Sequence, residues 1–177
     1  MLKFQNKIIN GDCLKELKKI PDNSFDLVFA DPPYNMQIGD WKQAEKDFLD
    51  SLKVKPNQAY VINYLAYSWI EKGINIEKSL KMLEEANRLR SNDGYITDSL
   101  GWALYKLKKY NKAKEYLKKA VQLMPSDPIV NDHFGDILWM NGDKLQARYY
   151  WKYVLNLENA EDDLKDEIMK KILNGPA

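Results

Sequence analysis

A repeat of about 34 residues constrains this chain more than any other feature of its sequence. Ala44, Ser79, Ala113 and Ala147 are spaced 35, 34 and 34 residues apart. The same spacing relates Phe48, Leu83, Leu117 and Trp151, then Ser51, Ala86, Ala120 and Val154, and upstream of these Leu65, Leu100 and Phe134. A fixed period of this length indicates an array of similar supersecondary units, each contacting its neighbours, rather than a single globular core.

The spacing inside each unit predicts two helices. Leu100 and Leu104 lie four residues apart, on one face of a first helix. Ala113 and Leu117 repeat the same spacing and place an apolar stripe on a second helix. The small residues Gly101 and Ala113 then allow the two helices to approach closely, so each unit is expected to be a helical hairpin.

Turn residues separate one unit from the next. Pro125 ends the second helix of its unit, because proline cannot continue a helix. Asp127 is expected to cap the next helix with its side chain, and Pro128 is expected to occupy the first turn.

On these registers, about residues 41–173 resemble the tetratricopeptide repeat family, whose 34-residue units are helix–turn–helix hairpins. The resemblance predicts a mainly α fold, a right-handed α-solenoid with about three full repeats, a half repeat and a capping helix. The expected boundaries are 41–58 for the half repeat, 59–93, 94–127 and 128–161 for the full repeats, and 162–177 for the capping helix and tail. Leu164, Ile168 and Ile172 form the apolar stripe of that last helix.

Residues 1–40 lie outside this period. Their pattern predicts a strand at 7–12, a short helix at 13–20 and a strand at 25–30, which is a small βαβ-like segment. Asp31, Pro32, Pro33 and Tyr34 follow the second strand directly.

Residues 1–37 resemble the start of a DNA adenine-N6 or cytosine-N4 methyltransferase, with Asp31, Pro32, Pro33 and Tyr34 as the matching motif. In that family the acidic residue and a proline carbonyl hold the amine of a flipped base, and the aromatic ring stacks on it. The resemblance stops near Met36, and no later segment supplies a Gly-rich loop for S-adenosylmethionine. We therefore expect a vestigial motif, no catalysis and no cofactor. The alternative is a residual or assembly-dependent DNA methylation role that uses S-adenosylmethionine.

The junction between the two segments leaves the helix expected at 41–55 without a preceding partner helix. Trp41, Phe48 and Leu52 would then expose apolar surface. One hypothesis is that residues 1–37 pack over this surface as a cap. The alternative is that their open strand edges pair with a second copy and form a homodimer.

First helices of stacked repeats line an inner surface on which peptides or partner helices bind. The predicted groove residues are Tyr60, Asn63, Tyr67, Tyr95, Asp98, Trp102, Tyr105, Asp132, Asp136 and Trp139. Aromatic and acidic side chains suit an apolar protein or peptide partner with Lys or Arg flanks. The expected function is therefore a non-enzymatic protein-interaction module. The alternative for the aromatic residues is packing between helices, and His133 is expected to make a structural hydrogen bond.

Composition narrows the remaining function classes. The chain has 27 basic and 26 acidic residues, so broad binding to nucleic-acid phosphates is not expected. The lysine-rich stretch at 106–119 is interpreted as a solvated outer face, with a nucleic-acid contact as the alternative. A single cysteine, Cys13, and a single histidine exclude a disulfide and the common metal motifs. The absence of a signal peptide and of a long apolar run predicts a cytoplasmic protein without membrane spans.

Overall fold

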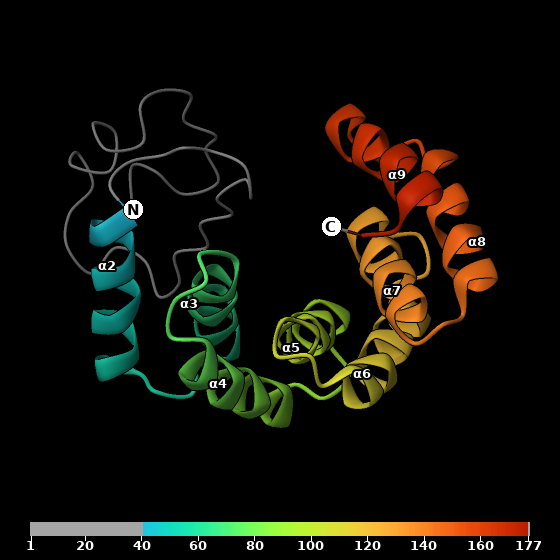
Figure 1. The fold of residues 1–177 in the computed structure, drawn as a ribbon. Coiled ribbons are helices and arrows are strands. Elements are labelled where there is room, and N and C mark those ends of the chain that lie inside the picture. Colours follow the sequence, from blue (N-terminus) through green and yellow to red (C-terminus); the bar gives the residue numbers. More distant parts are fainter. Residues whose placement is uncertain (1–40, 177) are drawn as a thin grey trace, which may run out of the picture. The chain divides into compact units, whose positions relative to one another are not determined.

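The computed structural model describes residues 41–176, and every regular element among them is an α-helix (Figure 1). The helices are α2 (Trp41–Val54), α3 (Ala59–Glu71), α4 (Ile76–Leu89), α5 (Gly94–Lys106), α6 (Tyr110–Leu123), α7 (Pro128–Met140), α8 (Lys144–Leu155) and α9 (Asp162–Asn174). The predicted βαβ-like segment and the motif at 31–34 lie outside the described residues.

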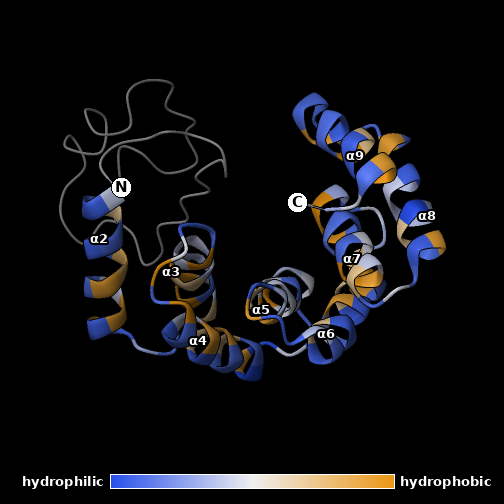
Figure 2. Cartoon of the chain, viewed as in Figure 1, coloured by the Kyte–Doolittle hydropathy of each residue, from blue (hydrophilic) through white to orange (hydrophobic). Residues whose placement is uncertain are grey.

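The helices form two rows, which confirms the predicted solenoid. The first helices of the hairpins, α3, α5 and α7, contact one another in sequence and form the inner row (Figure 1). The second helices, α4, α6 and α8, lie on the outside, each packed against its own partner and against the next inner helix. Apolar residues gather on the helix faces that meet, and polar residues cover the outer faces (Figure 2).

Small residues set the spacing between the rows, as the repeat pattern predicts. A Cβ atom on Gly101 would lie 2.6 Å from Cγ of Leu117, and one on Gly135 would overlap the indole of Trp151. The facing alanine Ala113 is fully buried. Larger side chains at these glycine positions would push the hairpin apart, because packed interiors have no spare volume.

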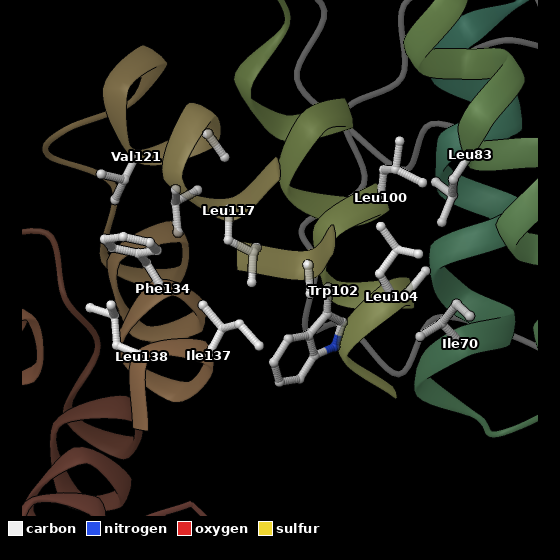
Figure 3. Packing of buried hydrophobic residues seen from close by; sticks show 14 of the residues in the cluster. Ile70, Leu83, Leu100, Trp102, Leu104, Leu117, Val121, Phe134, Ile137 and Leu138 are labelled. Carbon is white, nitrogen blue, oxygen red and sulfur yellow. The ribbon is translucent and has the colours of Figure 1, made fainter. Parts of the chain in front are cut away.

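The core fills the space between adjacent hairpins. Leu100 and Leu104 of α5 pack toward Ile70 and Leu83 of the preceding hairpin (Figure 3). On the other side, the side chains between α6 and α7 are Leu117, Val121, Phe134, Ile137 and Leu138. These contacts belong to a cluster that runs from Ala66 to Ile168, and a second, smaller cluster holds Ala59, Ile62, Ala86 and Ile96. Such a core is expected when each repeat buries its apolar face against its neighbours.

Helix starts and turns follow the predicted signals. The Asp127 carboxylate accepts a hydrogen bond from the Val130 amide at 3.0 Å, and Pro128 begins α7. Asp93 caps α5 in the same way. The α3–α4 turn holds four residues, 72–75, whereas the other two hairpin turns hold three. Asn75 takes up the extra residue with a left-handed φ of 50°.

Helix α9 continues the repeat rather than merely following it. It begins 34 residues after α7, and Leu164, Ile168 and Ile172 occupy the registers of Val130, Phe134 and Leu138. Ile168 is fully buried against the core, while Met169 is half exposed. Met169 stands where the inner helices carry Gly101 and Gly135. A second helix packed on α9 would therefore lie farther from it than α6 lies from α5.

Helix α2 is the equivalent end on the other side. It is the second helix of a half repeat, and none of its residues is fully buried. Phe48 and Ser51 are partly exposed, whereas their equivalents in α4, Leu83 and Ala86, are completely buried. Within the described residues α2 packs mainly on α3, so only part of its apolar face is covered. The predicted cap or dimer contact at 1–37 lies outside the described residues.

Candidate functional site

The inner row presents three matched positions per repeat, which we call the inner face. The first position holds Asn63, Asp98 and Asp132, the second Tyr67, Trp102 and Asp136, and the third Ile70, Tyr105 and Trp139. The three carboxylates, Asn63 and Trp102 are all less than one tenth exposed, whereas Tyr67, Tyr105 and Trp139 are half-buried. The predicted groove residues thus divide into a buried polar row and a set of more accessible rings.

Asp98 and His133 form a buried pair between α5 and α7. Asp98 Oδ2 lies 2.8 Å from Nδ1 of His133, which confirms the structural hydrogen bond expected for this histidine. The imidazole also stacks on Trp102, with ring centroids 3.9 Å apart. Burial disfavours the imidazolium, but the carboxylates of Asp98, Asp132 and Asp136 together outweigh that effect and raise the pKa of His133.

Asp132 and Asp136 share one ammonium group. Nζ of Lys171, on α9, lies 2.7 Å from Oδ2 of Asp132 and 3.0 Å from Oδ2 of Asp136. Burial, followed by the nearby Asp132 charge, raises the pKa of Asp136 to about 6 despite the ammonium. Burial opposes the charge of Lys171, but the two carboxylates outweigh it and raise the pKa of Lys171.

Three oxygen atoms of the inner face have no hydrogen-bond partner. They are Oδ1 of Asn63, Oδ1 of Asp98 and Oδ1 of Asp136. The described residues contain five such buried side-chain atoms, so most of them gather on this face. Buried acceptors without partners are costly and rare in folded proteins. The three oxygens lie on three successive inner helices, and each of them is shielded from solvent.

Aromatic residues make contacts between one repeat and the next. The Tyr60 hydroxyl donates to Asp93 at 2.7 Å, and Trp102 Nε1 donates to Glu71 at 2.6 Å. Tyr105 stacks on Trp102 at 4.7 Å. Tyr60 and Tyr95 are exposed at the start of their helices, at the edge of the inner face, with their rings near the capping aspartates. Several predicted groove aromatics therefore also contribute to inter-repeat packing.

Lys171 belongs to this site although the sequence pattern does not predict it there. The pattern assigns its helix to a solvated cap, with the lysines on the outer face. The 34-residue register, which continues into α9, could have predicted this position, because it makes α9 the next helix of the inner row. The C-terminal residues also reach this face, where Gly175 lies against the indole of Trp139.

The lysine-rich stretch begins at Lys106, the last residue of the inner helix α5, and continues through the turn into the outer helix α6. Lys112 and Lys118 are exposed, and Lys114 bonds Asp143 of the next repeat at 2.5 Å. The Lys106 ammonium lies 4.7 Å from the ring centre of Trp102. Lys108 and Lys109 are also exposed. The solvated outer face and the nucleic-acid contact both stay predictions for this stretch.

Two shallow depressions occur away from the inner face. One, of about 310 Å³, is lined by Leu52, Pro56, Ile62 and the side chains of α4; the other, of about 320 Å³, lies beside Tyr95 and the α6–α7 turn. Neither contains the inner-face carboxylates. In residues 41–176, no group of three acidic, histidine or cysteine side chains is arranged to hold a metal ion. None of the described helices is long and apolar enough to cross a membrane.

Sequence relatives cover both parts of the chain. The TPR repeat-containing protein PA4667 of Pseudomonas aeruginosa is 29% identical over 120 residues, which are 68% of this chain and 20% of that protein. The type II methyltransferase M.HinfI of Haemophilus influenzae is 62% identical over 34 residues, 19% of this chain and 10% of that protein. This chain spans a fifth or less of either relative. The short second match supports the methyltransferase-like resemblance of residues 1–37.

Solved structures share the fold. TTC0263, a TPR protein of Thermus thermophilus, matches with a TM-score of 0.63 at 17% identity, covering 73% of this chain and 72% of that one. The first TPR of Spaghetti (RPAP3), bound to the HSP90 peptide SRMEEVD, matches with a TM-score of 0.56 at 18% identity, covering 64% and 89%. The sequence model of the tetratricopeptide repeat matches residues 15–160. With the hairpin array described above, this match shows that the chain belongs to the tetratricopeptide repeat family.

Proposed function

We propose that this chain is a non-enzymatic scaffold that binds a peptide or a partner helix on its inner face. Stacked helical repeats expose extended surfaces that are suited to binding protein partners. A structure of the same fold holds a bound peptide, in the case of RPAP3. These features support the interaction role, and the chemistry of the inner face narrows the class of partner.

The acidic and aromatic side chains of the inner helices carry the proposal. Helices α3, α5 and α7 hold four acidic side chains against a single lysine, Lys106. A negative environment favours charged donors, so the partner is expected to present lysine or arginine side chains. The half-buried rings of Tyr67 and Trp139 add apolar contact area.

Lys171 is an example of such a donor within the chain itself. Its ammonium bonds two carboxylates of the inner row from the neighbouring helix α9. The equivalent position one repeat earlier, Asp98, is paired with His133 rather than with a lysine. A partner helix lying across α3 and α5 would place its lysine side chains in the same negative environment.

A pair of synthetic peptides tests the proposal. Both are amphipathic helices with an apolar stripe at i, i+4 and i+8; one carries lysine flanks and its matched control carries glutamate flanks. Titration calorimetry and the change in total tryptophan fluorescence report binding to the full chain. We expect the lysine peptide to bind at least about tenfold more tightly, a difference of about 1.4 kcal/mol.

Isosteric variants locate the contact. Asp98→Asn and Asp136→Asn each remove one charge and keep the side-chain shape, so the fold is retained. Each is expected to weaken the lysine peptide several-fold, whereas Glu115→Gln on the outer helix α6 leaves its affinity unchanged. Equal affinity of the two peptides, or no loss in either inner-face variant, would contradict the proposal.

A second candidate function is DNA amino-methylation through Asp31, Pro32, Pro33 and Tyr34. The 34-residue match to M.HinfI favours it. The role would require S-adenosylmethionine, with the remaining cofactor-binding part supplied by another polypeptide. Calorimetry with S-adenosylmethionine tests this directly: heat near one equivalent, lost in Asp31→Ala, would support it, and no heat would count against an unaided site.

A further inference from the structure

Helix α8 carries an exposed apolar stripe on its outer surface. Leu145, Tyr149 and Tyr153 are spaced four residues apart and share one side of the helix. Their side chains are 85%, 69% and 37% exposed. Large apolar residues scattered singly on a surface are ordinary, but a run along one helix marks an interaction surface.

The other repeats provide an internal comparison. The equivalent positions in α4 are Glu77, Lys81 and Glu85, and those in α6 are Asn111, Glu115 and Lys119. All six are polar or charged, as expected for the solvated side of an outer helix. The stripe is therefore specific to α8 and does not follow from the repeat pattern.

The charge of α8 restricts what can cover the stripe. The helix contains Lys144, Arg148 and Lys152 and no acidic residue. Two stripes meeting face to face would bring like charges together, which opposes a symmetric contact between two α8 helices. A covering surface that is acidic and partly aromatic is favoured, and the inner face has both properties.

We propose that α8 of one copy docks on the inner face of a second copy of this chain. The inference rests on the proposed function, because α8 is itself an apolar helix with basic flanks, the partner class favoured there. Leu145, Tyr149 and Tyr153 would pack on the half-buried rings, with Lys152 beside them toward the acidic side chains. Lys144 and Arg148 already lie 4.9 Å from the ring centre of Trp139 in their own chain. The contact joins two different surfaces, so each added copy leaves one surface of each kind free and the assembly can grow.

The contact is expected to be weak. Helix α8 has 12 residues and is about 18 Å long. A single helix of this length covers less than the roughly 800 Å² per partner of a standard stable interface. Association is therefore expected at tens to hundreds of micromolar chain, and it should weaken as salt rises because charges contribute to it.

Sedimentation velocity of the full chain across that concentration range tests the inference. We expect the mean mass to rise above the 20.7 kDa of one chain and to fall back in high salt. Tyr149→Lys on α8 should abolish the rise without affecting folding, since this ring is exposed. Glu115→Lys places a lysine at the matching position of α6 and is expected to leave association unchanged.

A mixing experiment separates the two surfaces. A Tyr149→Lys chain keeps its inner face, and a chain with both Asp98→Asn and Asp136→Asn keeps its α8 stripe. Each variant alone is expected to stay monomeric, whereas their mixture should form a 1:1 complex that grows no further. A wild-type chain that stays monomeric in low salt, or a mixture without a complex, would overturn the inference.

The peptide titration distinguishes this failure from that of the proposed function. If the lysine-flanked peptide binds while the chain stays monomeric, the self-docking inference is wrong and the inner-face proposal stands. If the chain associates through α8 but the inner-face variants have no effect, α8 docks elsewhere and the inference is equally wrong. If neither peptide binds nor chain associates, both proposals fail.

Discussion

The inner face and the outer surface of α6 both carry many charges, but they hold them in opposite ways. Asp98, Asp132 and Asp136 are nearly fully buried and are paired with side chains from neighbouring helices. Lys112 and Lys118 of α6 extend into solvent. Buried charges need partners, whereas exposed ones are screened by water and contribute little to stability. The location of a charge in the array, rather than its type, therefore decides what it does.

The largest expected effect comes from removing the shared ammonium. Lys171→Met leaves Asp132 and Asp136 buried beside each other without a counter-charge, which should lower the free energy of unfolding by about 4 kcal/mol. Urea denaturation measures the change. The matched outer variant, Lys118→Met, should leave the midpoint unchanged. Equal losses of stability for the two substitutions would show that a buried, paired lysine contributes no more than an exposed one.

The next effect is a pH dependence. Asp136 has a pKa of about 6 in the fold against an ordinary value of 3.8. Because the folded value is higher, its contribution to stability is complete below about pH 4 and is lost as pH rises through 6. The loss amounts to about 3 kcal/mol, at roughly 1.4 kcal/mol per unit of pKa difference.

The Asp136→Asn variant isolates that contribution. Subtracting its unfolding free energy from that of the wild type at several pH values cancels the other titrating groups. The unfolding free energy of the wild type should fall relative to that of the variant as pH rises from 4 to 7. A difference that stays constant over this range would mean that Asp136 titrates normally.

Asp98→Ala should have a smaller effect, a loss of about 2 kcal/mol. The substitution leaves the buried imidazole of His133 without its hydrogen-bond partner. It should also lower the pKa of His133, because the carboxylate that raises it is gone. Proton NMR of the single histidine follows this titration without overlap. An unchanged titration would show that Asp98 does not control the imidazole.

The smallest effect is expected at the edge of the inner face. Tyr60→Phe removes a hydrogen bond to Asp93 that is exposed to solvent, at a cost of about 0.5 kcal/mol. Chemical denaturation of the two proteins side by side is sensitive enough to detect this. A loss comparable with that of Asp98→Ala would place Tyr60 among the buried contacts.

Much of the fold was predictable because it depends on local patterns. The registers of Leu100, Gly101 and Ala113 identify the hairpins, since a 34-residue period and helical spacing leave little choice of arrangement. Asp127 and Pro128 likewise mark a helix start by their own chemistry. These signals require no knowledge of which distant residues meet.

The inner face was only partly predictable for the opposite reason. The repeat pattern placed Asp98, Asp132 and Asp136 on the inner helices, and their role in partner binding stays a prediction. Their contacts lie 35 and 39 residues away in sequence, at His133 and Lys171. Such pairs depend on how each helix is rotated against the next, which spacing within one helix does not determine.

Met169 has a consequence for how arrays of this kind lengthen. Repeat proteins grow by duplication of whole units, and a duplicated hairpin carries its own small residue, since Gly101 receives Leu117 and Gly135 receives Trp151 within one hairpin. A second helix packed on α9 at the same register would meet the Met169 thioether instead. A copy of a complete hairpin can therefore stack closely, whereas a hairpin built on α9 would first need a smaller residue at position 169.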